Sequence, residues 1–239
     1  MNVLAIGNSF SQDATRYLHQ IAACGGAELT VVNLYIGGCS LERHWQNARQ
    51  DLAEYAVEIN GEATGRLVSL KEMLRQDTWD IVTLQQVSQL SVDYRTYQPY
   101  LTDLSAMVRQ LAPSARQMIH QTWAYEQGSD RLMIELGYQD QSDMHRDLCL
   151  AYAQAARDLG GLTIIPSGAS FQAAIRQGLT PLHRDTFHAS LGLGRCLLGL
   201  TWYTALTGSE PGDLSALVFD EPIAPDLLSR LKTCVVKAG

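Results

Sequence analysis

The sequence predicts an α/β protein in which a parallel β-sheet carries helices on both faces. Short apolar runs alternate with helix-spaced segments about five times along the 239 residues, the pattern typical of such a sheet. Paired glycines end two of the helical segments, at Gly25-Gly26 and Gly160-Gly161. Hydrophobic residues make up 46% and charged residues 18% of the chain. This composition supplies a buried core and excludes disordered and collagen-like classes.

Each expected element follows from this alternation. No linker rich in Pro, Gly and Ser divides the chain, so we expect a single domain over residues 1–239. Asn60-Gly61 lies between two strand-like stretches and predicts a β-hairpin insertion at about 55–68. The expected strands cover residues 2–7, 29–36, 80–84, 115–120 and 162–165, and the expected helices cover 12–24, 40–54, 69–76, 100–111, 141–159 and 189–207.

Charge and cysteine content narrow the classes of partner. The formal net charge of −7 argues against nucleic acid, which needs clustered Lys and Arg. The five cysteines are odd in number and form no CxxC pair, so neither a disulfide framework nor a zinc knuckle is expected. We expect reduced thiols in a reducing compartment, and we expect no secretory signal because no basic region precedes the first apolar run. A cytoplasmic location, with no cofactor, is therefore predicted.

The apolar stretch 189–207 approaches the length of a membrane span. Its only charge is Arg195, but it also holds three glycines and follows a polar loop. A charge in the middle of a bilayer is costly, so a buried helix is the favoured interpretation and no membrane partner is expected.

A serine follows the first expected strand, in Gly7-Asn8-Ser9-Phe10-Ser11. Ligands of parallel sheets bind at the carboxyl ends of the strands, and a helix N-terminus there favours an anion or a developing oxyanion. Ser9 is therefore a candidate nucleophile. The alternative is that Ser9 or Ser11 only caps the helix.

Asp185 and His188 stand three residues apart before the last expected long helix. A serine hydroxyl needs a histidine to take its proton, and the histidine needs a carboxylate to orient it. Asp185 and His188 could supply both roles. A metal site of His183, Asp185 and His188 is the rival interpretation, since two histidines and one carboxylate can bind a metal.

Two further strand ends carry candidate oxyanion donors. Gly37-Gly38 follows the second strand, where a backbone N–H of Gly38 could reach a ligand. Amide side chains end the third strand, which is unusual for an apolar sheet, and they could donate as well. These polar residues are Gln85, Gln86, Ser88 and Gln89.

Taken in order, these blocks resemble those of the SGNH, or GDSL-type, serine hydrolase superfamily. Ser9 matches the nucleophile block, Gly38 the second block, and Asp185 with His188 the last Asp-x-x-His block. The chain looks most similar to an uncharacterised, mainly bacterial branch whose first block reads Gly-Asn-Ser-Phe. The resemblance implies a three-layer sandwich around a five-stranded parallel sheet of flavodoxin-like order.

Two departures from the superfamily pattern stand out. Asn8 replaces the usual aspartate, and the third block lacks Gly-x-Asn-Asp. The expected oxyanion donors are the N–H groups of Ser9 and Gly38 with the amide of Gln85, and Gln86, Ser88 and Gln89 remain alternatives for the third donor.

The resemblance implies hydrolysis of carboxylic esters through an acyl-Ser9 intermediate. The substrate would carry O-acetyl or other short acyl groups, with a carbohydrate as the expected partner, and no metal is expected. Trp45, Trp123 and Tyr125 are expected in exposed loops and are candidates for stacking on a sugar. The alternative from another class is a non-catalytic carbohydrate-binding relative. The oligomeric state is not predicted.

Overall fold

A seven-stranded mixed sheet forms the centre of the computed structural model, which describes residues 1–238. The strand order is β4-β3-β2-β1-β5-β6-β7, and the strands from β2 to β7 in that order are parallel. The expected five-stranded parallel sheet is therefore wrong in strand number, while the α/β class holds. The strands are β1 Asn2–Gly7, β2 Thr30–Tyr35, β3 Tyr55–Ile59, β4 Glu62–Val68, β5 Ile81–Leu84, β6 Arg116–His120 and β7 Thr163–Ile165.

The two additional strands are the hairpin at 55–68. β3 pairs antiparallel with both β2 and β4, so the hairpin extends the sheet beyond its parallel part. Asn60 and Gly61 both have positive φ, 54° and 83°, as the favoured two-residue hairpin turn requires. A Cβ on Gly61 would also lie 2.2 Å from the carbonyl oxygen of Arg16. Glycine is therefore needed here both for its conformation and for the close approach.

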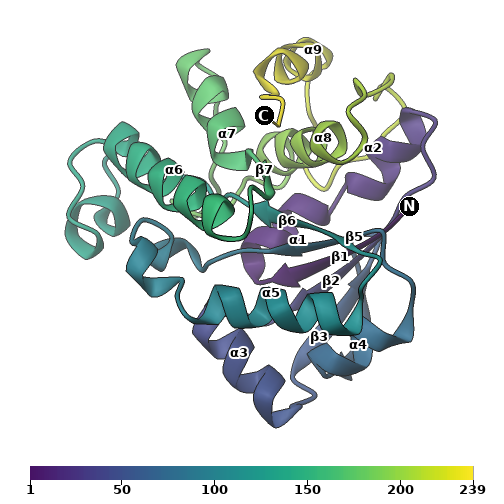
Figure 1. Cartoon of the computed structure of the whole chain (residues 1–239). Helices are drawn as coiled ribbons and strands as arrows, with labels where there is room; N and C mark the ends of the chain where they lie inside the picture. The colour runs from purple at the N-terminus through teal and green to yellow at the C-terminus, as the bar shows by residue number, and fades with distance from the viewer. Residues whose placement is uncertain (239) are drawn as a thin grey trace.

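Helices cover both faces of the sheet (Figure 1). Helices α3, α4 and α5 pack together on one face, while α1, α2 and α7 contact the central α8 on the other. Their bounds are α1 Ser9–Thr15, α2 Leu18–Cys24, α3 Leu41–Gln50, α4 Leu70–Gln76, α5 Tyr100–Leu111, α6 Gln141–Asp158, α7 Ser167–Arg176, α8 Leu193–Thr207 and α9 Pro225–Cys234, with short turns η1 Ser88–Leu90, η2 Tyr94–Thr96 and η3 Arg131–Glu135.

The helices differ from the sequence prediction both in their boundaries and in their number. The helix expected at 12–24 is two helices, and the first begins already at Ser9. Helix α8 begins at Leu193 and not at 189, because residues 185–190 form the loop that precedes it. Helices α7 and α9 were not expected. Pro225 at the first helical position of α9 is a start signal that could have revealed it.

The apolar stretch before Gly208 is a core helix. Most side chains of α8 are buried, including Trp202 and Leu198, both 0% exposed. Between residues 1 and 238, the structure contains no helix that combines the length and apolar character needed to cross a bilayer. All five cysteines are free thiols, and Cys39, Cys196 and Cys234 are buried.

An ion pair fastens the segment after α8 to the end of α1. The Asp220 carboxylate accepts hydrogen bonds from Arg16 at 2.7 and 2.9 Å and from Arg195 at 2.8 Å. The hydrogen bond from Arg16, helped by the charges of both arginines against partial burial, lowers the pKa of Asp220 from 3.8 to about 2. The Asp220 carboxylate therefore binds a proton less readily in the folded state than in the unfolded chain.

Asp220 is expected to stabilise the fold in a pH-dependent way. A depressed carboxyl pKa contributes stability that is fully present above the unfolded pKa and is lost as the pH falls through the folded one. The free energy of unfolding of wild type minus that of Asp220→Asn should thus be constant above about pH 5 and shrink between about pH 4 and 2. Urea unfolding of both proteins across this range measures the difference. A difference that stays constant down to pH 2 would contradict this assignment.

Candidate active site

Ser9 is the first residue of α1, and only Asn8 separates it from the end of β1. The side chain of Asn8, not that of Ser9, caps the helix, because Asn8 Oδ1 accepts from the backbone N–H of Phe10 at 3.0 Å. Ser11 Oγ instead lies within hydrogen-bond distance of two acceptors, the Asn8 carbonyl at 2.9 Å and Asn33 Oδ1 at 2.6 Å. The Ser9 hydroxyl is therefore not used for capping and remains available for chemistry.

A tight loop before α8 carries Asp185 and His188. The backbone N–H of Arg184 donates to the His188 carbonyl at 3.1 Å and closes the loop. Thr186 lies within it at φ 73°, a conformation that β-branched residues rarely adopt. Its carbonyl accepts from the N–H of Glu126 at 2.7 Å. Such strain persists only where the surroundings hold the backbone, and it is found most often at functional sites.

The structure brings Ser9, His188 and Asp185 together in one hydrogen-bonded row. His188 Nε2 lies 2.7 Å from Ser9 Oγ, and Nδ1 lies 2.8 Å from Asp185 Oδ2. Asp185 Oδ1 also accepts from the backbone N–H of His188 at 2.9 Å. When Nδ1–H is donated to the carboxylate, the lone pair of Nε2 faces the serine hydroxyl. This arrangement can remove the proton of Ser9.

The electrostatics of Asp185 suit a group that supports His188. Burial tends to raise its pKa, but hydrogen bonds from the side chain and backbone of His188, together with the charge of Arg184, hold it below the usual 3.8. The carboxylate is therefore charged at neutral pH. It is also 46% exposed, whereas the His188 side chain is 17% exposed.

Aromatic rings enclose the imidazole. The ring centroid of Phe187 lies 3.8 Å from that of His188, and Phe10 lies 5.8 Å away. Trp123 stacks on Phe10 at 4.1 Å and donates its indole N–H to the Phe187 carbonyl at 2.8 Å. Trp123 thus contacts both Phe10, in the helix of Ser9, and Phe187, in the loop of His188, and helps to hold that loop in place.

Two of the three expected sugar-stacking residues are buried. Trp123 is 0% and Tyr125 1% exposed, and the Tyr125 hydroxyl lies 2.9 Å from Ser88 Oγ. The prediction that Trp123 and Tyr125 stand in exposed loops is wrong, because the segment that follows β6 is packed in the protein interior. Trp45 packs partly buried in α3 beside Lys71 and Met107, on the face formed by α3, α4 and α5.

Gly38 lies in the turn that follows β2. Its φ of 61° and the open space at its missing Cβ are consistent with a backbone that approaches a ligand. The N–H of Cys39 donates to the Ile36 carbonyl at 3.2 Å, which closes the turn. The side chain of Asn8 donates to the Cys39 carbonyl at 3.0 Å and ties this turn to the loop that carries Ser9.

The polar residues after β5 have different environments. Gln86 is buried and binds the backbone of Leu41, Val87 and Thr96, so it joins loops together. Gln89 is exposed, and Ser88 pairs with Tyr125 as described above. Gln85 is buried directly beside the Ser9 loop and donates to Asn8 Oδ1 at 2.8 Å. One amide N–H of Gln85 is thereby used, and no hydrogen bond of the second N–H is found among the described residues.

Gln85 belongs to a buried chain of hydrogen bonds that sequence reasoning missed. His120 Nδ1, at the end of β6, lies 2.7 Å from Gln85 Oε1, and His120 Nε2 lies 3.0 Å from Ser167 Oγ, after β7. Continued through Asn8 to the Cys39 carbonyl, the chain joins the carboxyl ends of all the parallel strands. Burial lowers the pKa of His120 to about 3, so its ring is neutral. Its position as a histidine that ends an apolar strand was the available signal.

The alternative metal site does not assemble. His183 Nε2 lies 3.0 Å from the carbonyl oxygen of Ala124, while Asp185 and His188 bind each other. Within residues 1–238, no three His, Cys, Asp or Glu side chains are grouped so as to hold a metal ion.

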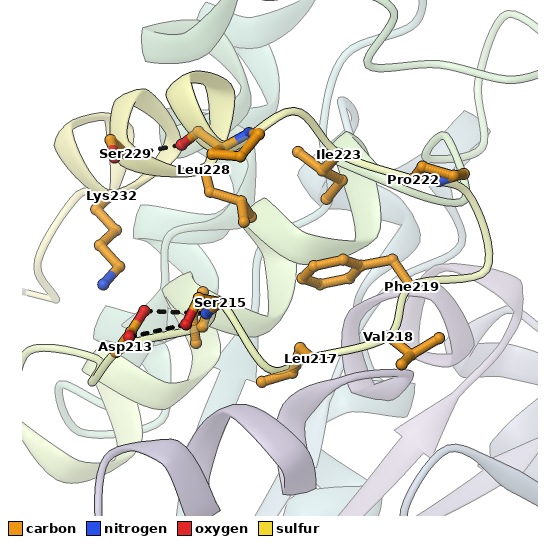
Figure 2. A pocket seen from close by; sticks show the side chains of 12 residues that line it. Asp213, Ser215, Leu217, Val218, Phe219, Pro222, Ile223, Leu228, Ser229 and Lys232 are labelled. Carbon is orange, nitrogen blue, oxygen red and sulfur yellow. Dashed lines mark hydrogen bonds between the residues drawn. The ribbon is translucent and has the colours of Figure 1, made fainter.

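A hollow of about 490 Å³ lies elsewhere, between the segment after α8 and helix α9 (Figure 2). Its walls are mostly apolar, with Phe219, Ile223 and Leu228 among them, and Lys232 lies at one end. Lys232 Nζ donates to the Gly212 carbonyl at 2.6 Å. None of Ser9, Asp185 or His188 lines this hollow.

The sheet and its covering helices define an α/β protein whose fold is shared with solved structures of hydrolases, among them a candidate SGNH hydrolase. The chain belongs to the family described as a domain of unknown function (DUF4886), whose model matches residues 2–230. A DUF4886 family protein from Bacteroides uniformis is 34% identical, with a TM-score of 0.89 over 98% of this chain and 93% of that chain.

Two more distant structures share the fold. A candidate SGNH hydrolase from Slackia heliotrinireducens is 24% identical, with a TM-score of 0.62 over 85% of this chain and 97% of that chain. An acetyl xylan esterase from Geobacillus stearothermophilus is 15% identical, with a TM-score of 0.51 over 84% of this chain and 92% of that chain. No curated protein matches the chain in sequence.

Proposed function

We propose that this protein is a serine hydrolase that cleaves carboxylic esters through an acyl-Ser9 intermediate. The observation that carries the proposal is the row from Ser9 Oγ through His188 to Asp185, with contacts of 2.7 and 2.8 Å. These three groups can perform the three roles of nucleophile, base and orienting carboxylate.

In the first half of the reaction, His188 Nε2 takes the proton of Ser9 as Oγ attacks the acyl carbon. The resulting tetrahedral oxyanion needs hydrogen-bond donors. We assign this role to the backbone N–H groups of Ser9 and Gly38 and to the remaining amide N–H of Gln85. Collapse of the intermediate breaks the ester bond, and His188 returns its proton to the departing alkoxide.

In the second half, His188 activates a water that attacks the acyl carbon of the ester on Ser9. The acid leaves, and Ser9 recovers its proton. Throughout both halves, Asp185 stabilises the charge that forms on the imidazole ring. We propose a short acyl group as the acid component of the ester. The acetyl xylan esterase among the solved structures of this fold supports an O-acetylated carbohydrate as the substrate class.

The test is an activity screen of the purified protein against aryl acetate, aryl butyrate and acetylated oligosaccharides. We expect turnover of the short aryl esters, release of acetate from at least one acetylated carbohydrate, and covalent labelling of Ser9 by a fluorophosphonate. Ser9→Ala is the control and should neither turn over the esters nor take up the label.

The alternative, a non-catalytic carbohydrate-binding relative, makes the opposite prediction. It would bind oligosaccharides, as calorimetry can show, without turnover of any ester and without labelling of Ser9. That combination would overturn the proposed hydrolase.

A further inference from the structure

Asp13 is a fully buried carboxylate one helical turn after Ser9 in α1. Its side chain is 0% exposed, and it faces two arginines whose side chains are 26% and 12% exposed, Arg184 and Arg195. A buried charge is retained only where its partners are well arranged, and replacement by apolar residues is often no less stable. The position of Asp13 therefore calls for a role besides stability.

Asp13 contacts both ends of the loop that carries Asp185 and His188. We call these ends, Arg184 before the loop and Ala189 after it, the stems of the loop. Asp13 Oδ2 accepts from the backbone N–H of Ala189, directly after His188, at 3.1 Å. Arg184, directly before Asp185, approaches both carboxylate oxygens of Asp13 at 2.9 and 3.0 Å. The same guanidinium also donates to the Ala189 carbonyl. Arg195 adds a hydrogen bond to Oδ1 at 2.8 Å.

Helix α1 thus carries the Ser9 hydroxyl and also holds, through Asp13, the loop of His188. Helix α1 presents Ser9 at its first residue and Asp13 a turn later, so the distance between the hydroxyl and the clamped loop depends on a single helical turn. The loop has no regular secondary structure of its own, and Thr186 within it is strained. Without the contacts at its two stems, the loop could relax and move His188 away from Ser9.

We propose that Asp13 is a positioning residue, which fastens the His188 loop to the helix of the nucleophile and so sets the distance between Ser9 Oγ and His188 Nε2. This inference rests on the proposed serine hydrolase function. A displacement of about 1 Å at a reacting group can slow a reaction about a hundredfold.

The first test compares Asp13→Asn with Asp220→Asn. The amide retains the size of Asp13 but offers one acceptor oxygen where the carboxylate serves two arginines and a backbone N–H. Asp220 is the matched control, because it also pairs with Arg195 but has no contact with the loop. Rates on an aryl acetate are measured well below the melting temperature of every variant.

We expect Asp13→Asn to lower kcat about tenfold to a hundredfold with little change in KM, while Asp220→Asn keeps the wild-type kcat. Proton NMR supplies a readout besides activity, since the His188 Nδ1–H shared with Asp185 should resonate far downfield in the wild type. This signal should broaden or disappear in Asp13→Asn and persist in Asp220→Asn. A melting temperature well above the assay temperature for both variants excludes loss of the fold as the cause of this difference.

Arg184→Gln is the second variant, and it decides the question if Asp13→Asn does not fold. It leaves Asp13 paired with Arg195 but removes the tether at the first stem of the loop, so the same fall in kcat and loss of the signal are expected. A folded Asp13→Asn, or failing that Arg184→Gln, with wild-type kcat and an intact signal would overturn the positioning role. If Ser9→Ala remains active, the proposed function itself fails, and this outcome is distinct from the other.

Discussion

Replacement of Ser9 by alanine is expected to lower kcat on an aryl acetate by about 10⁴-fold or more while the melting temperature stays near that of the wild type. Loss of the nucleophile of a triad removes the covalent route entirely, and only the background from binding and oxyanion donors remains. The fold should tolerate the change, because Asn8 caps α1 and the Ser9 hydroxyl serves no structural bond other than that to His188 among the described residues. Steady-state kinetics and thermal unfolding of both proteins measure the two quantities.

Ser69→Ala is the matched control for that experiment. Ser69 caps α4 through a hydrogen bond from the Glu72 N–H at 3.1 Å and also donates to Asp51 at 2.6 Å, remote from the candidate site. This change should lower stability by about 1 kcal/mol, the typical effect of losing a cap, and leave kcat unchanged. If Ser9→Ala behaves like Ser69→Ala, with lower stability and intact activity, Ser9 is only structural.

Replacement of Asp185 by asparagine is expected to slow the reaction by about 10³- to 10⁴-fold, and at least as much as replacement by alanine. Asp185 uses two acceptor oxygens, one for the His188 ring and one for the His188 backbone N–H. The amide has one acceptor, so it must present an N–H to one of these donors. If it turns that N–H toward the ring, His188 takes the tautomer that cannot accept the proton of Ser9. Alanine instead leaves space for a water.

The measurement for Asp185 is the steady-state rate of Asp185→Asn and Asp185→Ala on an aryl acetate, with and without added zinc or manganese. Both variants should remain faster than Ser9→Ala, since the orienting carboxylate is the least costly member of a triad to lose. Asp140→Asn, a similar change at the exposed cap of α6, should have wild-type activity. An alanine variant much slower than the asparagine variant would refute the tautomer argument, and rescue by metal would favour the rival metal site.

The sequence predicts best what depends on local pattern. The strand that ends at Gly7, the turn at Asn60-Gly61 and the buried helix before Gly208 all follow from short-range signals of apolar spacing and turn residues. The spacing of Asp185 and His188 likewise permits the two hydrogen bonds between them, because both residues lie in one loop. Resemblance to known sequence blocks, rather than periodicity, supplied the partnership with Ser9.

What depends on tertiary contacts could not be predicted. That β3 and β4 would join the main sheet is decided by pairing with the free edge of β2, which no local pattern encodes. Trp123 and Tyr125 follow a strand and look like exposed loop residues, but packing against Phe10, Phe187 and Ser88 buries them. Asp13 looks like an ordinary polar residue of a surface helix, and its partners are more than 170 positions away along the chain.

The hydrogen bonds from Ser167 to the Cys39 carbonyl all run in one direction. The hydroxyl of Ser167 donates to His120, His120 to Gln85, Gln85 to Asn8, and Asn8 to the carbonyl, so the bond dipoles add along the row. In a low-dielectric interior such an alignment polarises each member and strengthens its neighbours. Because a backbone carbonyl can only accept, the Cys39 carbonyl at the end of the row fixes the direction of every hydrogen bond before it. The orientation of the Gln85 amide beside Ser9 is thus decided jointly by five loops, including one at the far edge.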